Sequence, residues 1–401
     1  MPGPLDGVKV VACSIAQAGT VPYSLMADLG AEVIKVEVPG TGDGSRRTAE
    51  TSEWPSSYFE TNNRGVKSVT LNLKSSKGRE ILHQLVSTAD VFGQNFRPGA
   101  AEKNGFGYEE LKKHNPKLVY VSVSGYGPKG PHASLPATDA MAQGIGGITE
   151  VFAGTGDRAT TGIASVADET CAMVTFGAIV TGLYCAKSTG IGQRIDTSLL
   201  GGQIRLMGWT LTNVMWRDEP PITGRARITG SRRQAGISAT FEDSDGRPFV
   251  FQLGGRQWEV AMRAVGFYEE LKSEGLDDLG IIHESDEERA RFFAKLDALF
   301  ALDKRDRWVE ALRNADIVAA PVNTMLESSK DPDVLANGYI TEVDYPDFDK
   351  KLKVHGAPWQ FSETPAKAGR APSLGEHNDE VLGRLGYGAE EISSLESEGV
   401  V

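Results

Sequence analysis

Short apolar runs recur through the first half of the chain, and each is followed by a longer stretch with helical periodicity. A short apolar run bounded by Gly, Asn or Ser favours a buried strand, whereas a helix requires a longer periodic segment. These runs predict strands at residues 7–13, 32–37, 68–73, 91–95, 118–124 and 193–198. Because strands that alternate with helices pair in parallel, the pattern predicts a doubly wound α/β domain.

Segments between the predicted strands have the length and periodicity of helices, which supply the crossovers that parallel strands need. They are a segment after Ala16–Gly19 that stops at Leu29-Gly30, and the ranges 75–88, 139–150 and 168–187. Ser75 or Ser76 is the expected N-cap of the second of these helices.

Asp168 stands at the start of the last of these helices, in the almost uncharged run Gly162–Leu183. An Asp that opens an apolar helix is usually an N-cap. The first-turn amides and the helix dipole also favour an anion there, so Asp168 is in addition a candidate nucleophile. We expect the helix start to keep this carboxylate ionised at neutral pH.

The composition of the chain changes near residue 217, where a stretch rich in Arg and Gly follows the last of the predicted helices. After it come two strand-like runs and a charged helical region, at Ile237–Phe241, Pro248–Leu253 and 257–314. A polar tail begins after Ala320–Asn323 and stops in the helical segment Ala389–Gly399. We predict a large α/β domain at 1–216, a small α+β domain at 217–323 and a third segment at 324–401.

Composition and charge narrow the classes of function. Among 401 residues, 40% are hydrophobic, which is enough for a sizeable core. The formal net charge of −12 argues against nucleic acid or an anionic membrane surface as a partner. A small anionic ligand needs only a local basic position, so such a ligand stays compatible with the charge.

Several kinds of segment and site are not expected. The first residues lack the basic leader and apolar run of a signal peptide, and the apolar region 172–186 is too short to span a membrane. Cys13, Cys171 and Cys185 lie in apolar runs, which favours buried thiols in a reducing cytoplasm over disulfides. The six histidines lack ligand spacing, so no metal site is predicted. We therefore expect a cytoplasmic, globular protein.

The first strand, turn, helix and second strand suggest a dinucleotide site, with Glu37 where a ribose-binding acid would sit. The turn, however, reads Ala16-Gln-Ala-Gly-Thr20 and lacks the three glycines that let the backbone approach a pyrophosphate. A dinucleotide-dependent oxidoreductase is kept only as the third hypothesis.

The motif Asn95-Phe96-Arg97-Pro98-Gly99 follows a predicted strand, at the edge where ligands bind to open α/β sheets. Arg97 is suited to a phosphate group and Phe96 to an adenine ring. The alternative is an ordinary Pro-Gly turn with a solvated arginine.

Eight short segments, spread in order over nearly the whole chain, match segments of a known family. The segments are Leu5–Val10, Ala27–Glu37, Asn62–Ser68, Leu71–Lys74, Asn95–Gly99, Gly192–Leu200, Ala320–Asn323 and Arg370–His377. Each alone is a weak signal, but the ordered set resembles the class III CoA-transferases. That family includes the formyl-CoA:oxalate, carnitine and aromatic-acid CoA-transferases, and α-methylacyl-CoA racemase is related to it.

The resemblance implies roles for individual residues. Asp168 matches the catalytic aspartate of the family. Asp139 matches an acidic position, and we assign to Asp139 and Gln17 a supporting role; for Asp139 the alternative is a plain helix cap. The positions that contact CoA match Gln17, Ala18, Leu71, Lys74, Asn95, Phe96, Arg97 and Lys103, the last in place of a family arginine.

The resemblance also implies an interlocked dimer in which the tail rejoins the N-terminal domain. A homodimer is expected, and a heteromer with a homologous subunit is the alternative assembly. An acyl-CoA and a free carboxylic acid would be the substrates, coenzyme A a co-substrate, and no permanently bound cofactor is needed. The sequence does not reveal the acid pair; family habits point to succinyl-CoA as donor and to a branched or aromatic acid as acceptor.

In a reaction of this family, CoA passes from donor to acceptor through an aspartyl-CoA thioester, here on Asp168. Backbone amides at the start of its helix are the expected donors to the oxyanions. A racemase needs a histidine before the aspartate of the segment Pro136–Asp139, and Thr138 stands there, which cannot exchange protons at carbon. A non-catalytic, acyl-CoA-binding subunit is the other alternative, and retention of Asp168 speaks against it.

Family members that use oxalate carry a glycine tetrad on a lid over the site. The matching segment Gly230–Gly236 keeps only its end glycines. Arg232 and Arg233 are candidates to face the second carboxylate of a larger acid, and solvated loop arginines are the alternative.

Overall fold

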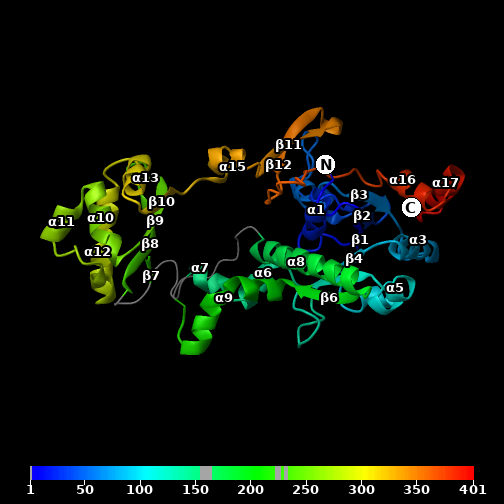
Figure 1. Cartoon of the computed structure of the whole chain (residues 1–401), viewed down its shortest axis with the longest axis horizontal. Coiled ribbons are helices and arrows are strands. Elements are labelled where there is room, and N and C mark those ends of the chain that lie inside the picture. The colour runs from blue at the N-terminus through cyan, green and yellow to red at the C-terminus, as the bar shows by residue number, and fades with distance from the viewer. Residues whose placement is uncertain (1, 154–164, 222–226, 230–233) are drawn as a thin grey trace. The chain divides into compact units, whose positions relative to one another are not determined.

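The computed structural model describes residues 2–153, 165–221, 227–229 and 234–401 (Figure 1). Contacts divide the chain into two compact units. The first combines residues 1–148, 161–211 and 332–401, and the second combines 149–160 and 212–331. The last seventy residues therefore fold with the first ones, which brings distant parts of the sequence into one unit.

The first unit is built on a sheet of parallel strands. The strands are β1 (Lys9–Cys13), β2 (Glu32–Glu37), β3 (Lys67–Thr70), β4 (Val91–Gln94), β5 (Val119–Ser124) and β6 (Gln193–Ser198). Their order in the sheet is β3-β2-β1-β4-β5-β6, and every pair is parallel. This is the order of a doubly wound Rossmann-like sheet, so the predicted fold of this part is confirmed.

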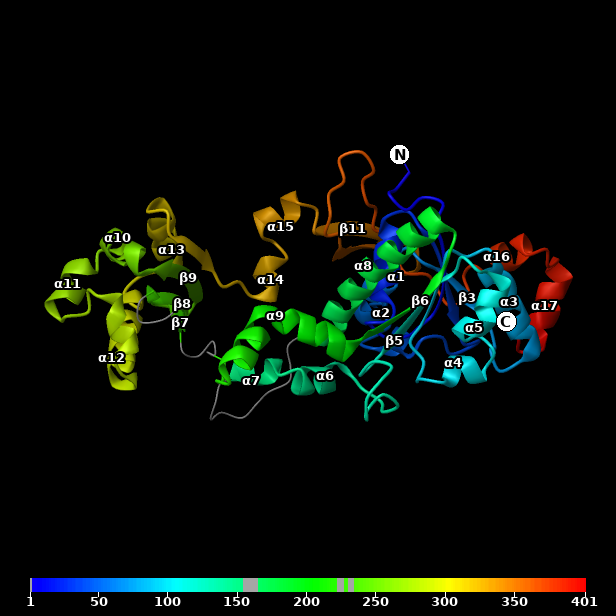
Figure 2. The ribbon, with the colours of Figure 1, turned by 60° about the horizontal axis from the view of Figure 1, so that its bottom comes forward.

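Both faces of the sheet are covered by helices (Figure 2). Val10 and Ala12 of β1 point to a core with α1 (Val21–Asp28) and α8 (Val166–Thr189). Val11 and Cys13 point to the opposite core, formed with α3 (Ser76–Ser87), α5 (Tyr108–His114), α16 (Asn378–Arg384) and α17 (Ala389–Ser397). Strands buried on both faces read as continuous apolar runs, which is why they could be recognised in the sequence.

Helix α8 is longer than the range 168–187 expected from the sequence. In the described part of the chain it is the one helix with the length and hydropathy of a membrane span. It packs against α1, β5 and β6, and Cys171, Ile179 and Leu183 lie in the core beneath it. At Gly182 an added Cβ would lie 2.9 Å from side-chain atoms of both Val119 and Ile195, so the small residue permits this close packing.

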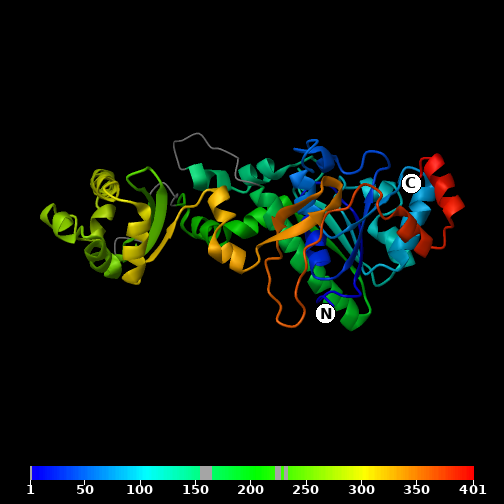
Figure 3. The same cartoon turned by 90° about the horizontal axis from the view of Figure 1, so that it is seen from above.

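Short helices and a hairpin complete the first unit. They are η1 (Gly44–Arg47), α2 (Ser57–Asn62), α4 (Ala100–Lys103), α6 (Asp139–Ile145), α15 (Pro332–Ala336), η5 (Pro346–Phe348) and the hairpin β11 (Ile340–Tyr345) with β12 (Lys350–His355). The hairpin was not predicted, because polar residues dominate both of its strands; Figure 3 shows it in orange beside α2. Two helices, α7 (Ile148–Ala153) and α9 (Leu199–Arg217, kinked at Gly208), lead from this unit into the second.

The segment at residues 367–378, which we call the C-terminal strap, is bonded to the start of the chain. The N–H of Lys367 donates to the carbonyl of Asp28 at 2.8 Å, and the N–H of Gly65 donates to the carbonyl of Arg370 at 2.8 Å. The N–H of His377 donates to the Ser68 carbonyl at 3.0 Å. The strap therefore runs along the edge of the sheet formed by β3.

The second unit has a sheet of antiparallel strands in the order β10-β9-β8-β7. Phe241, Phe249, Phe251 and Phe300 pack against one another in its core. The expected strands and helices of this region are present, whereas β10 was not predicted. The elements are β7 (Ile228–Thr229), β8 (Gly236–Glu242), β9 (Pro248–Gly254), β10 (Val318–Pro321), α10 (Gly255–Val265), α11 (Tyr268–Ser273), η4 (Leu279–His283), α12 (Asp286–Phe300), α13 (Arg305–Asn314) and α14 (Met325–Ser328).

Candidate active site

Asp168 lies in the first turn of α8 as its third helical residue. The N-cap is Ser165, in a left-handed conformation with φ 47°, and its side chain makes no capping bond. The expectation that Asp168 is itself the cap is wrong. The carboxylate of Asp168 therefore does not cap the helix.

The cap of α8 comes from the neighbouring helix α6. Oδ1 of Asp139 accepts hydrogen bonds from the N–H of Ala167 at 2.8 Å and from the N–H of Asp168 at 3.1 Å. The side-chain amide of Gln143 donates to the other oxygen of Asp139. Both amides are thereby engaged, so our expectation that the amides at the start of α8 serve a reacting oxyanion is wrong for these two.

The pKa of Asp168 is raised to about 7, mainly by burial and in addition by the negative charges of Asp139 and Glu169. The expectation that the helix start keeps Asp168 fully ionised is therefore wrong. A carboxylate with this pKa is about half ionised at neutral pH and is more basic than an exposed aspartate.

The loop between β1 and α1 carries Gln17 to this group. The side chain of Gln17 is buried, and its amide nitrogen donates to Oε1 of Glu169. The preceding residue, Ala16, has φ 60°, and the hydroxyl of Thr20 donates to the carbonyls of Ala16 and Gln17. Gln17, Glu169 and Asp168 thus come together from segments far apart in the sequence.

Asn95 holds the same loop from the end of β4. Its Oδ1 accepts from the N–H of Ile15 at 3.0 Å, and its Nδ2 donates to the carbonyl of Ile15 at 2.8 Å. A Cβ added at Gly19 would lie 2.6 Å from this amide nitrogen, so glycine is required there. In the structure, the side chain of Asn95, a predicted CoA contact, fixes the backbone of the loop.

Tyr58 of α2 belongs to the same region and was missed by sequence reasoning. Burial raises the pKa of its phenol to about 12, and the charge of Asp168 is the next cause. His355, at the end of β12, has a lowered pKa because of desolvation and the charge of Arg64, against which Glu169 acts. Neither residue lies in a motif, so no local signal pointed to either of them.

A cavity of about 590 Å³ opens at the carboxyl ends of the strands, where the sheet order reverses between β1 and β4. Leu71, Lys74 and Phe96 line it, whereas Gln17, Ala18, Asn95, Arg97 and Lys103 are not in its wall. The ring of Phe96 is 38% exposed and lies 5.5 Å from the ring of Phe106. An aromatic face at this edge is suited to a nucleotide base.

Cationic side chains near this cavity are exposed. Lys74, Arg97 and Lys103 are the three at predicted CoA contacts, and none forms an ion pair with a residue that the structure describes. Exposed cations of this kind are available to phosphate groups.

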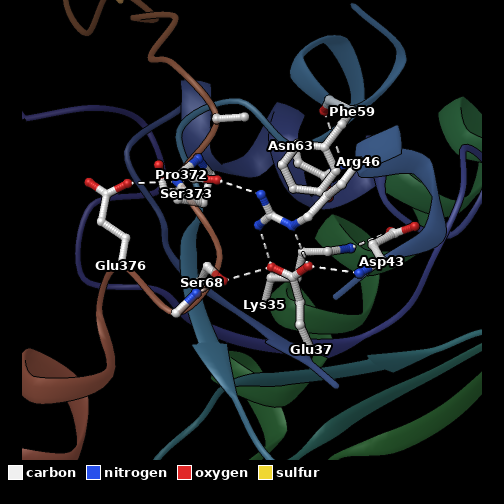
Figure 4. Close-up of polar contacts among 12 residues, drawn as sticks. Lys35, Glu37, Asp43, Arg46, Phe59, Asn63, Ser68, Pro372, Ser373 and Glu376 are labelled. Carbon is white, nitrogen blue, oxygen red and sulfur yellow. Dashed lines mark hydrogen bonds and ion pairs between the residues drawn. The ribbon is translucent and has the colours of Figure 1, made fainter. Parts of the chain in front are cut away.

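Glu37 also faces the cavity, but its carboxylate is used within the protein. It accepts hydrogen bonds from Asp43, Arg46 and Ser68 (Figure 4). Although burial acts to raise the pKa of Glu37, Arg46 and Lys35 outweigh it and hold the pKa below its usual range. A carboxylate bonded in this way is not free for ribose hydroxyls, which removes the main support for a dinucleotide site.

Further expectations concern the predicted lid segment, metal sites and the cysteines. Gly230, Arg232 and Arg233 lie outside the described residues. Within the described ranges, no group of His, Cys, Asp and Glu is arranged to hold a metal ion. Cys13 and Cys171 are buried, Cys185 is half-buried, and all are free thiols.

Comparison with known proteins decides the family. The model of CoA-transferase family III matches residues 5–378. The chain belongs to CoA-transferase family III. It is an enzyme of this class, and Asp168, the loop with Gln17 and all cavity-lining residues except Gly399 lie in the part that the family model covers.

Individual members of the family are similar to this chain over nearly its whole length. A formyl-CoA:oxalate CoA-transferase of Streptomyces coelicolor is 31% identical over 99% of this chain and 99% of its own. The human succinyl-CoA:glutarate CoA-transferase is 30% identical over 99% of this chain and 90% of its own. Among solved structures, a CAIB/BAIF family protein from Brucella suis matches with a TM-score of 0.84 and 29% identity, over 96% of this chain and 100% of that one.

Proposed function

We propose that this enzyme moves CoA from an acyl-CoA donor to a free carboxylic acid through an aspartyl-CoA thioester on Asp168. The observation that carries the proposal is the setting of Asp168. It is a half-buried carboxylate in the first turn of α8, with a pKa raised to about 7 and its backbone fixed by Asp139. A carboxylate that is fixed in place and more basic than usual is suited to nucleophilic attack.

The proposed reaction is a sequence of acyl transfers. An oxygen of Asp168 attacks the thioester carbonyl of the donor, the C–S bond breaks, and a mixed anhydride and CoA thiolate result. The thiolate attacks the carbonyl carbon of Asp168, which releases the donor acid and leaves the thioester. The acceptor carboxylate then repeats the two steps in reverse, and Asp168 is regenerated as a carboxylate without net proton transfer.

Two neighbouring residues support Asp168 in this proposal. Asp139 fixes the helix start through the N–H groups of Ala167 and Asp168, so it positions the nucleophile rather than attacking. The side chain of Gln17 is oriented by Glu169, which leaves its remaining amide groups for the reacting carbonyl or for substrate.

We assign the cavity to the nucleotide part of CoA. Phe96 would stack on the adenine, and Leu71 would contact its edge. Lys74, Arg97 and Lys103 would meet the phosphates, while Ala18 and Asn95 shape the loop beside the thioester end. Coenzyme A is thus a co-substrate of a site that needs no permanently bound group.

The substrates and the assembly are part of the proposal. Both named relatives transfer CoA to dicarboxylic acids, oxalate and glutarate, and we propose succinyl-CoA as the first donor to test. We also propose that the protein is cytoplasmic and that it forms a homodimer. The homodimer is supported by several large apolar side chains that are exposed on α8 and α9. These are Met173, Val174, Val180, Tyr184, Ile204, Leu206 and Trp209.

Trapping the intermediate tests the function directly. The protein is incubated with each of a panel of acyl-CoAs, hydroxylamine is added, and the peptides are weighed by mass spectrometry. We expect a hydroxamate on the peptide that contains Asp168, formed only with true donors, and none in Asp168→Asn. A protein that binds CoA but gives no hydroxamate with any donor would instead favour a racemase-like enzyme or a non-catalytic subunit.

A further inference from the structure

The side chains of Glu37 and Arg46 form a closed ion pair at the end of β2. Nε of Arg46 lies 2.8 Å from Oε2 of Glu37, and Nη2 lies 2.6 Å from Oε1. The side chain of Glu37 is 1% exposed and that of Arg46 is 16% exposed. The guanidinium carbon of Arg46 lies 3.8 Å from the centre of the Phe59 ring, so the pair is stacked as well as hydrogen-bonded (Figure 4).

The backbone between these two residues forms one wall of the CoA cavity. Val38, Pro39, Gly42 and Asp43 line the cavity together with Glu37. The wall is fastened to the pair, because the N–H of Asp43 donates to Oε2 of Glu37 at 2.9 Å. The wall therefore depends on the position of the Glu37 carboxylate.

A second buried ion pair holds the far end of this wall. Nζ of Lys35 donates to Asp43 at 2.9 Å and to the carbonyl of Ser14 at 2.7 Å. Both charged side chains are almost completely buried. Since Ser14 also lines the cavity, this pair connects two of its walls.

The ion pair also binds the C-terminal strap. Nη1 of Arg46 donates to the carbonyl of Pro372 at 2.9 Å. The hydroxyl of Ser68 donates to Glu37 at 2.7 Å and accepts from the N–H of Gly375 at 3.0 Å. Gly42 of the wall is closely packed between Glu37 and the strap, because an added Cβ would lie 2.9 Å from side-chain atoms of both Glu37 and Leu374.

We propose that Arg46 and Glu37 are positioning residues for acyl-CoA, through which the C-terminal strap sets the geometry of the cavity wall at 38–43. The inference rests on the proposed assignment of this cavity to CoA. Neither side chain needs to touch the ligand. Removing either partner leaves a buried charge unpaired, and the wall then relaxes away from the position that fits CoA.

The test compares kinetics and binding of the full-length protein. Arg46→Met removes the ion pair and the bond to Pro372, whereas Ser68→Ala removes only the link between Glu37 and the strap. Arg305→Met is the matched control in the second unit, because Arg305 is also buried, pairs with Glu327 and donates to main-chain carbonyls. Arg46→Lys keeps the charge but not the two-pronged geometry.

We expect Arg46→Met to raise the KM for acyl-CoA and the Kd for free CoA by about tenfold, with a much smaller change in kcat and in the KM for the acceptor acid. Ser68→Ala should produce a smaller change in the same direction, and Arg46→Lys should lie between Arg46→Met and the parent protein. The control Arg305→Met should leave both constants unchanged in the folded fraction.

If Arg46 and Ser68 had a purely structural role, the variants would show a different pattern of kinetics and binding, and that pattern would overturn the inference. All three variants at Arg46 and Ser68 would then lower only the amount of folded enzyme, as Arg305→Met does, with KM and Kd unaltered. If Arg46→Met does not fold, Ser68→Ala decides alone by the Kd for CoA. A parent protein that binds no CoA would contradict the proposed function itself, which separates the two failures.

Discussion

The carboxylate of Asp139 fixes the backbone of Asp168 and at the same time raises the pKa of its side chain. The first effect is a hydrogen bond of 3.1 Å to the N–H of Asp168, and the second is the repulsion between two negative charges. Asp139 therefore contributes both to the positioning of Asp168 and, next to burial, to its raised pKa.

Replacing Asp139 separates these two effects. Asp139→Asn keeps an oxygen that can accept from the helix amides but removes the charge, so the pKa of Asp168 should fall. We expect the acid limb of the pH profile of kcat/KM to move to lower pH, with the fold intact. Asp139→Ala removes both effects and should in addition lower kcat by about tenfold or more. An acid limb that stays in place in Asp139→Asn would show that Asp139 acts only as a cap.

The pH dependence of the parent enzyme follows from the same pKa. In the proposed mechanism only ionised Asp168 attacks, and its pKa is raised to about 7. The value of kcat/KM should therefore rise with pH up to about 7 and become constant above it. Measurements between pH 5 and 9 check this, and activity that is already constant at pH 5 would contradict a raised pKa.

Asp168→Asn should stop the reaction and stabilise the fold. We expect kcat to fall by at least about a thousandfold, because the variant has no nucleophile. The folded-state pKa of Asp168 lies above its value in the unfolded chain, so the folded state binds the extra proton between about pH 4 and 7 and loses stability as pH rises through this window. The variant should thus be more stable than the parent at pH 8, by on the order of 2–4 kcal/mol, and not at pH 4.

Thermal denaturation at the two pH values measures this difference in stability. Glu390→Gln, which changes an exposed carboxylate on α17, is the control and should show no such dependence on pH. Equal stabilities of Asp168→Asn and the parent at both pH values would contradict the prediction.

A double mutant tests whether Asn95 acts through the loop that carries Gln17. Gly19→Ala alone places a Cβ against the Asn95 side chain and should disturb the loop, with a loss of activity. Asn95→Ala alone leaves both polar groups of Ile15 without this partner and should cost about 1–3 kcal/mol. In the Asn95→Ala background the two closest contacts of a Cβ at residue 19 are gone and only the one of 3.1 Å to the Cβ of residue 95 remains, so Gly19→Ala should do less harm than in the parent. Strict additivity of the two effects would contradict this coupling.

The parts of the fold that could be predicted are those whose signal is local. The parallel strands read as apolar runs because they are buried on both faces, and the N-cap Ser75 stands directly before its helix. The hairpin β11–β12 and strand β10 were missed, since β11 carries Glu342 and Asp344, β12 carries Lys350, Lys351 and Lys353, and β10 is four residues long. The domain boundaries at 216 and 323 stay predictions.

The same distinction holds for the site. Asp168 could be found from its place before an apolar helix and from the family resemblance, but its raised pKa could not. That pKa depends on burial and on Asp139, which is distant in the sequence and becomes a neighbour only through the fold. Tyr58 and His355 reach the site from segments without any motif, and the ties between Arg46 and the strap join residues at opposite ends of the chain.

The cavity is closed in part by the last residues of the sequence. Gly399 lines it, and the carbonyl of Val400 accepts a hydrogen bond from the N–H of Asn72 at 2.8 Å. During synthesis on the ribosome, β1 to β4 emerge long before these residues do. The part of the cavity wall that Gly399 forms is therefore completed only after the rest of the chain has been synthesised.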